Sequence, residues 1–209
     1  AVAEIRVPAD SPNLIESKSL KLYLNSLNAM RYPDAHHVER LLRDDLGAAA
    51  GGAVEVRVMG LERVSEAAIH DAEGTCIDDL PITIEHYGPP EPAFLCTNPG
   101  TRVSETLVSH LLKSNCPVTA QPDWASVVIS YQGAAIERAG LLRYIVSYRN
   151  HDEFHEQCVE RMFRDLLARC APDQLSVSAR YTRRGGLDIN PWRGNAAQLA
   201  VPNRRLLRQ

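Results

Sequence analysis

Hydrophobic residues along the chain follow two spacings, one typical of strands and one typical of helices. The segments AVAEIRV (1–7) and SVVISY (126–131) are rich in β-branched residues and partly alternate, which indicates strands. AVEVRVMGL (53–61) and QLSVSARYTRR (174–184) alternate in the same way. Helical spacing occurs in four segments, namely SLKLYLNSLNAM, HHVERLLRDDL, GLLRYIVSYRN and FHEQCVERMFRDLLARC. The order strand, two helices, strand occurs twice and predicts an α+β fold.

The two sets are copies of one unit. Shifting the sequence by 121 residues without gaps aligns ten identical residues within the 31 positions from 16 to 46, among them Glu16/Glu137 and Tyr23/Tyr144. We therefore divide the chain into a first module, 1–97, and a second module, 98–209. A joint from about residue 62 to 99 would connect the two copies. A segment ahead of the second copy, TRVSETLVSHLLKSNCPVTAQPDW, has no counterpart in the first, so we expect the first module to lack its N-terminal part.

Composition limits the classes of function. The chain is 44% hydrophobic and 23% charged with a formal net charge of -3, which gives no indication of direct nucleic-acid binding. No apolar run is long enough to span a bilayer, so no membrane partner is expected. The five cysteines are widely spaced without a CxxC pair. This spacing argues against a disulfide framework and favours a cytoplasmic protein.

The copies differ at two polar clusters. The first copy reads ESKSLK at 16–21, where the second reads ERAGLL. The second has His155-Glu156, where the first has Asp34-Ala35. Each copy thus keeps polar groups that the other lacks. This pattern suits either a composite site between copies or ordinary divergence after duplication.

Local motifs leave several interpretations open. In ESKSLK, Ser17 or Ser19 could cap a helix whose free N–H groups, with Lys18, would bind a phosphate; a capped helix with solvated lysines is the alternative. In HDEFHEQC, the spacing of His151, His155 and Cys158 suits zinc, although packing is the commoner explanation. A carboxylate at a helix start, as at Glu156, could accept two hydrogen bonds from an edge like that of guanine.

Two further segments contain reactive or anion-binding residues. RYTRRGG places Arg183-Arg184 before Gly185-Gly186, which suits a phosphate clamp or simply a basic strand end. SNCPVTAQPDW places Cys116 seven residues before Asp123. The pair could be a nucleophile and its proton donor if burial keeps the carboxyl protonated, whereas an isolated cysteine is more often a small buried apolar residue.

Taken together, four segments resemble the motif blocks of the 7-cyano-7-deazaguanine reductases, the nitrile reductases of queuosine biosynthesis. In chain order they are ESKSLKLYLNSLN, LLKSNCPVTAQPDW, FHEQCVERMF and ARYTRRGGLDINPWR. The similarity is closest to the long, two-module branch. It implies tandem tunnelling-fold (T-fold) modules, each an antiparallel sheet with a helix pair on one face, and a homodimer.

The resemblance also implies roles for particular residues. Cys116 would form a covalent thioimide with the nitrile carbon, and Asp123 would supply a proton to the nitrogen. Two hydrides from NADPH would then give 7-aminomethyl-7-deazaguanine, a precursor of a modified tRNA nucleoside, without a metal. The residues implied for the substrate are Ile15, Glu16, Ser17, His155 and Glu156. Those implied for NADPH are Ser17, Lys18, Arg184 and Gly185.

Two other classes of protein remain as alternatives. A zinc enzyme of the same fold, similar to the GTP cyclohydrolases, would use Cys116, His151 and His155 as ligands. A catalytically silent purine-binding or assembly module would be expected to lack the Cys116–Asp123 pair or Glu156, and all three residues are present.

Overall fold

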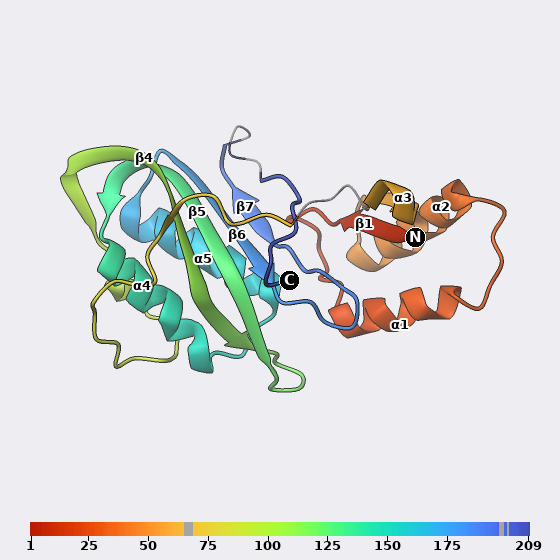
Figure 1. Cartoon of the computed structure of the whole chain (residues 1–209), viewed down its shortest axis with the longest axis horizontal. Helices are drawn as coiled ribbons and strands as arrows, with labels where there is room; N and C mark the ends of the chain where they lie inside the picture. The colour runs from red at the N-terminus through yellow and green to blue at the C-terminus, as the bar shows by residue number, and fades with distance from the viewer. Residues whose placement is uncertain (65–68, 197–198, 200) are drawn as a thin grey trace. The chain divides into compact units, whose positions relative to one another are not determined.

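The computed structural model describes residues 1–64, 69–196, 199 and 201–209 (Figure 1). The chain forms two compact units, Ala1–Ala68 and Ile69–Gln209. Each unit combines strands with helices, which confirms the α+β class. In the part of the chain that is described, no helix has the length and apolarity needed to cross a membrane.

The first unit is a two-stranded antiparallel sheet with a helix pair. Strands β1 (Val2–Arg6) and β2 (Glu55–Met59) pair along their whole length. Helices α1 (Ser17–Leu27) and α2 (Ala35–Ala50) lie between them in sequence, and the short α3 (Leu61–Val64) follows. The buried residues of α2 recur every fourth position and form a core with Val54; they are Leu42, Leu46 and Ala50.

The second unit is built on a five-stranded sheet in the order β3-β4-β5-β6-β7. Its strands are β3 (Thr75–Cys76), β4 (Thr97–Asn115), β5 (Pro122–Ile136), β6 (Gln174–Tyr181) and β7 (Trp192–Gly194). The pairing is parallel between β3 and β4 and antiparallel elsewhere. Helices α4 (Arg138–Val146) and α5 (His155–Cys170) follow β5, and the short helix η2 (Ser147–Asn150) lies between them. Another short helix, η1 (Pro92–Phe94), precedes β4.

Both long helices of the second unit pack on one face of its sheet. Alternate residues of β5 and β6 belong to the same buried core as residues of α4 and α5, and they are Ala125, Val127, Ile129, Tyr131, Leu175, Val177, Ala179 and Tyr181. Successive side chains of a strand point to opposite faces, so these residues share one face. The intervening positions Ser126, Ser176 and Ser178 are buried polar residues on the other face.

The segment expected to join the copies packs against the second unit. It contains β3 and η1, and the buried side chains of Ile77 and Leu95 belong to the core of the second unit. The compact units therefore divide after residue 68. The module boundary at 97/98 stays a prediction about the limits of the T-fold modules.

The repeat is visible in the structure, but its second helices are shifted by one residue. Helices α1 and α4 begin at Ser17 and Arg138, 121 positions apart, each after a glutamate N-cap. Helices α2 and α5 begin only 120 positions apart. Their C-caps, Gly51 and Ala171, are also 120 apart, and both adopt the left-handed conformation.

Burial follows the shorter offset within the second helices. Leu46 of α2 corresponds to the buried Leu166 of α5, rather than to the half-buried Leu167 that the ungapped alignment selects. Tyr23 donates to Asp45, and Tyr144 donates to Asp165, each at 2.6 Å. The ungapped offset of 121 is therefore wrong for these helices, because the second copy has one residue fewer between its helix starts.

We expect Tyr144→Phe to lower the free energy of unfolding by about 1–3 kcal/mol. Tyr144 is fully buried, and its hydroxyl bonds both Asp165 and the Tyr148 hydroxyl, the latter at 2.8 Å. Burial, with the neighbouring Tyr148, raises the pKa of Tyr144 far above the usual value, so the group is a neutral donor at working pH. Urea denaturation followed by far-UV circular dichroism measures the change.

Tyr87→Phe is the matched control for this variant. The Tyr87 hydroxyl bonds the Ile84 carbonyl at the surface, so its loss should change stability by less than about 0.5 kcal/mol. Equal stability of the two variants would contradict a structural role for the Tyr144 hydroxyl.

Candidate active site

Strands β4 and β5 form a long hairpin (Figure 1). Cys116 and Asp123 lie at its closed end. Ser114 pairs with Asp123, and Asn115 pairs with Pro122. The Cys116 N–H then donates to the Gln121 carbonyl at 2.9 Å, and the Cys116 carbonyl accepts from Ala120 at 2.8 Å. Because side chains alternate along a strand, Ser114, Cys116 and Asp123 share one face of the hairpin. All three are buried.

The Asp123 carboxylate is buried between two cationic or polar partners. Its side chain is 5% exposed. Arg184 Nη2 lies 2.6 Å from Oδ1, and His155 Nε2 lies 3.2 Å from Oδ2. A buried carboxyl group without partners is strongly disfavoured, and here a guanidinium and an imidazole lie within hydrogen-bonding distance of its two oxygens. These contacts make Asp123 the centre of a buried polar network.

His155 is positioned by the start of α5 and by β6. It is the first residue of the helix, and its ring packs on Tyr181 with ring centroids 4.1 Å apart. Tyr181, the last residue of β6, is fully buried, and it pairs with Ala125 of β5. Glu156 follows directly in the first turn of α5, where a helix N-terminus favours negative charge.

The loop before α5 is joined to the strand that leads to Cys116. The Asn115 N–H donates to the His151 carbonyl at 2.8 Å, and the Glu153 N–H donates to the Asn115 carbonyl at 3.1 Å. The Glu153 carboxylate accepts two hydrogen bonds from Arg161, at 3.0 and 2.7 Å. Desolvation favours the neutral form of Glu153, but these bonds and the contact with His151 lower its pKa overall. The start of α5 is thereby tied to the end of β4.

Arg184 lies on a tight turn after β6. Arg184 and Leu187 exchange two backbone hydrogen bonds, and Gly185 and Gly186 between them have positive φ. Arg183 bonds both carboxylate oxygens of Asp188 at 2.8 Å, and this bond is the main reason that the pKa of Asp188 is lowered. The turn is thus held by an ion pair beside the residue that contacts Asp123.

In the first unit, Glu16 rather than a serine caps α1. Its carboxylate accepts from the N–H groups of Lys18 and Ser19 at 2.9 and 2.8 Å and from the Ser19 hydroxyl at 2.9 Å. Desolvation alone raises the pKa of Glu16, but these hydrogen bonds lower it by more. The expectation that Ser17 or Ser19 is the cap is therefore wrong, because the longer glutamate side chain reaches both N–H groups. Ile15, just before the cap, packs on the core of this unit.

The predicted site residues thus fall into two groups. Ile15, Glu16, Ser17 and Lys18 lie at the start of α1 in the first unit. The second unit holds the others, which are Cys116, Asp123, His155, Glu156, Arg184 and Gly185. Sequence reasoning did not identify Tyr181, nor the contact of Arg184 with Asp123. These residues are brought together by sheet pairing, and no local spacing signals it.

The structure does not gather the ligands that the zinc alternative requires. Cys116, His151 and His155 would have to converge, but His151 Nε2 lies 3.0 Å from Glu153 and His155 bonds Asp123. Over the described residues, the one His/Cys/Asp/Glu group with metal-binding spacing consists of Cys76, Asp78 and His110. The expected absence of a catalytic metal stays a prediction.

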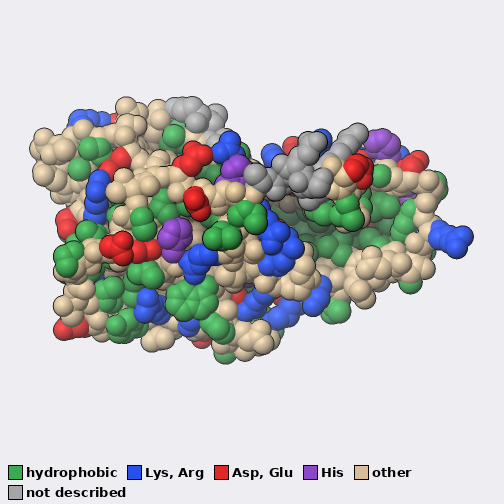
Figure 2. Space-filling model, in the orientation of Figure 1, with side chains coloured by type: hydrophobic (Ala, Val, Ile, Leu, Met, Phe, Trp, Pro, Cys, Tyr) green, Lys and Arg blue, Asp and Glu red, His purple; other side chains and the backbone are tan. Residues whose placement is uncertain are grey.

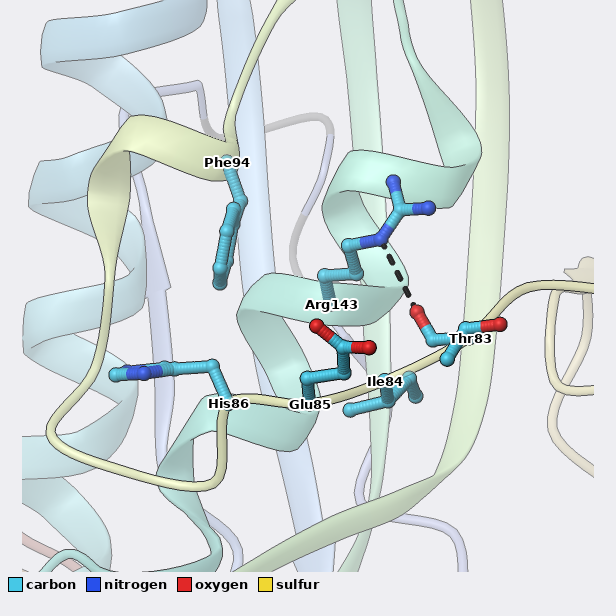
Figure 3. A pocket seen from close by; sticks show the side chains of 6 residues that line it. All are labelled: Thr83, Ile84, Glu85, His86, Phe94 and Arg143. Carbon is cyan, nitrogen blue, oxygen red and sulfur yellow. Dashed lines mark hydrogen bonds between the residues drawn. The ribbon is translucent and has the colours of Figure 1, made fainter.

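An open pocket of about 400 Å³ lies elsewhere in the second unit (Figure 3). Its lining residues are Thr83, Ile84, Glu85, His86, Phe94 and Arg143, none of which is a predicted site residue. The Arg143 guanidinium reaches the Thr83 carbonyl across it. The face of the second unit seen in Figure 2 shows both acidic and basic side chains.

Comparisons with known proteins match both parts of the chain. Residues 1–58 match a family described as "Nitrile reductase, 7-cyano-7-deazaguanine-reductase N-term", and residues 122–199 match one described as "QueF-like protein". The crystal structure of the archaeosine synthase QueF-Like in the apo form is similar to part of this chain, with 19% sequence identity and a TM-score of 0.39. The match covers 55% of this chain and 99% of the other chain.

Curated proteins are similar over nearly the whole chain. The NADPH-dependent 7-cyano-7-deazaguanine reductase of Dechloromonas aromatica (strain RCB) is 57% identical over 209 residues, all of this chain and 74% of that protein. The protein of the same name from Bordetella avium (strain 197N) is 54% identical over 100% of this chain and 76% of its own length. The protein of the same name from Azoarcus sp. (strain BH72) is 60% identical over 195 residues, which cover 93% of this chain and 69% of that protein. This chain belongs to the family of NADPH-dependent 7-cyano-7-deazaguanine reductases.

Proposed function

We propose that this chain reduces the nitrile of 7-cyano-7-deazaguanine to the primary amine of 7-aminomethyl-7-deazaguanine, through a covalent thioimide on Cys116. The relatives carry this reductase activity in their names, and it is a step of queuosine biosynthesis. One observation supports this mechanism: His155 and Arg184 both contact the buried Asp123, which lies on the same hairpin as Cys116.

Cys116 adds to the nitrile carbon in the first step. A new S–C bond forms, one π bond of the nitrile breaks, and its electron pair goes to nitrogen. A proton must arrive there at the same time, or an anion would accumulate in a buried site. Asp123 delivers this proton from the pair that it forms with His155, and the thiol proton of Cys116 restores the balance.

When bound, NADPH supplies two hydrides in succession, so that one nitrile consumes two NADPH and two protons. After the first reduction the C–S bond breaks and Cys116 recovers its sulfur electron pair. The carbon is then open for the second reduction. Asp123 again delivers protons to the nitrogen, while burial of Cys116 and Asp123 limits the access of water.

Substrate and cofactor contacts draw on both units. The carboxylates of Glu16 and Glu156 suit the donor edge of the deazaguanine, with Ile15, Ser17 and His155 beside it. The proposed cofactor residues fit an anionic group: Arg184 uses one guanidinium nitrogen on Asp123 and has further donors, and Gly185 has no Cβ to block a phosphate. Lys18 and Ser17 add a cation and a hydroxyl at the start of α1.

The same argument supports tandem T-fold modules that assemble as a homodimer. Each unit has an antiparallel strand pair and a helix pair with a glutamate N-cap at the first helix. The first unit keeps Glu16, Ser17 and Lys18, and the second keeps the cysteine, so each module supplies a part of the proposed site residues.

We expect Glu16→Gln to raise the KM for the deazaguanine at least tenfold, about 1.4 kcal/mol, because a carboxamide offers one acceptor oxygen instead of two. Glu137→Gln is the matched control, since Glu137 is the N-cap of α4 at the equivalent position. Both variants should lose similar stability by thermal denaturation, and only Glu16→Gln should change steady-state KM. If both leave KM unchanged, Glu16 is a helix cap and nothing more.

We expect Asp188→Asn to raise the KM for NADPH about fivefold, equivalent to about 1 kcal/mol, because it breaks the bidentate pair that holds the Arg184 turn. Formation of the covalent adduct without NADPH should be unchanged. Single-turnover adduct formation and steady-state kinetics separate the two effects. Loss of the adduct with an unaltered KM would show that the turn supports Cys116 instead of the cofactor.

Intact-mass analysis tests the thioimide. Mixing the chain with 7-cyano-7-deazaguanine without NADPH should add the full mass of the nitrile, since addition releases nothing. Cys116→Ala should give no adduct, and Asp123→Asn should form it roughly 10²-fold more slowly.

Cys96→Ala, which removes an exposed cysteine, should keep the adduct. Adding NADPH should discharge it with oxidation of the cofactor. An adduct that persists in Cys116→Ala would exclude this cysteine as the nucleophile.

A further inference from the structure

Three metal-binding side chains converge where β3 pairs with β4, apart from the proposed reduction site. Cys76 is paired in register with Val108, and the Ile77 N–H donates to the Val108 carbonyl at 3.0 Å. This pairing brings Cys76 and Asp78 beside His110 of β4. The sulfur, one carboxylate oxygen and one ring nitrogen all lie within 4.8 Å of one another.

A β-bulge sets the direction of His110. Ser109 pairs with Val127 and Leu112 with Ala125, so two residues of β4, His110 and Leu111, oppose the single Ser126 of β5. A β-bulge changes the direction in which a side chain points, and bulges are common beside functional sites. The Ser126 hydroxyl lies 2.8 Å from His110 Nδ1, which gives the ring an outer partner of the kind that orients a metal-binding imidazole.

Asp78 is oriented by its own set of hydrogen bonds. One carboxylate oxygen accepts from the Ser109 hydroxyl at 2.6 Å, and the other accepts from the His110 N–H at 2.8 Å. A carboxylate has about four acceptor positions, so a metal ion can still bind. Both the imidazole and the carboxylate therefore have the outer partners that hold metal ligands in place.

We propose that Cys76, Asp78 and His110 bind one Zn²⁺ ion, with water as the fourth ligand. Sulfur, nitrogen and oxygen donors together suit zinc, which takes four ligands in a tetrahedron. The thiolate and the carboxylate balance the charge of the ion. The metal joins β3 to β4 and thereby fastens the segment before residue 97 to the sheet of the second unit. It takes no part in nitrile reduction.

The first experiment counts zinc on the full chain. After treatment with a chelator, the protein is loaded with ZnCl₂, passed through a desalting column and assayed for metal by mass spectrometry. We expect one zinc per chain. Cys76→Ser and His110→Gln should each lower the affinity at least tenfold in competition with a chromophoric chelator, and Ser126→Ala should lower it about tenfold through the ring orientation.

Matched controls separate this site from the other cysteines. Cys96→Ser removes another exposed thiol, and Cys116→Ala removes the nucleophile; both should keep one zinc per chain. Co²⁺ in place of zinc should give a thiolate charge-transfer band that Cys76→Ser abolishes. Nitrile reduction by Cys76→Ser should equal that of the native chain.

A measurement without variants covers the case in which a substitution prevents folding. Zinc should protect Cys76 from alkylation by iodoacetamide in the native chain, as located by peptide mass. The proposal is overturned if the native chain retains no zinc, if Cys76→Ser binds it as tightly as the native chain does, or if the zinc is lost from Cys116→Ala.

Discussion

The buried carboxylate of Asp123 is the interaction on which the arrangement of the second unit depends. Asp123 comes from β5, His155 from the first turn of α5, and Arg184 from the turn after β6. A carboxyl group with 5% exposure is costly to bury unless its hydrogen-bonding partners stay in place. One side chain therefore restrains three elements, and the same restraint fixes the end of the hairpin that leads to Cys116.

Duplication explains why a common frame carries two different sets of polar groups. Glu16 and Glu137 cap the first helix of each copy in the same manner, with the carboxylate on two backbone N–H groups. After Glu137 comes Arg138-Ala139-Gly140, where the first copy has Ser17-Lys18-Ser19. The cap preserves the helix in both copies, and the residues that follow are free to differ without loss of the fold.

Periodicity predicted the strands and helix pairs because burial on one face leaves a regular trace in sequence. The spacing of seven residues between Cys116 and Asp123 was visible in the sequence, and in the structure it spans the turn of one hairpin. Contacts made through the tertiary fold left no such trace: Arg184 meets Asp123 from 61 positions away. The one-residue shift of the second helices was hidden because identical residues also occur at the ungapped offset. In the joint, the apolar residues follow no regular spacing, so the sequence did not indicate that Ile77 and Leu95 are buried in the core.

The hairpin also sets an order of events during synthesis. Residues 97–136 hold both strands, so the cysteine and the aspartate can pair while the chain is still being made. His155 and Arg184 leave the ribosome later, and domains fold as their residues become available. Until then Asp123 lacks both of the side chains that contact it in the finished fold. A partly synthesised chain therefore holds the hairpin with Cys116 and Asp123 before the helix and the turn that restrain it exist.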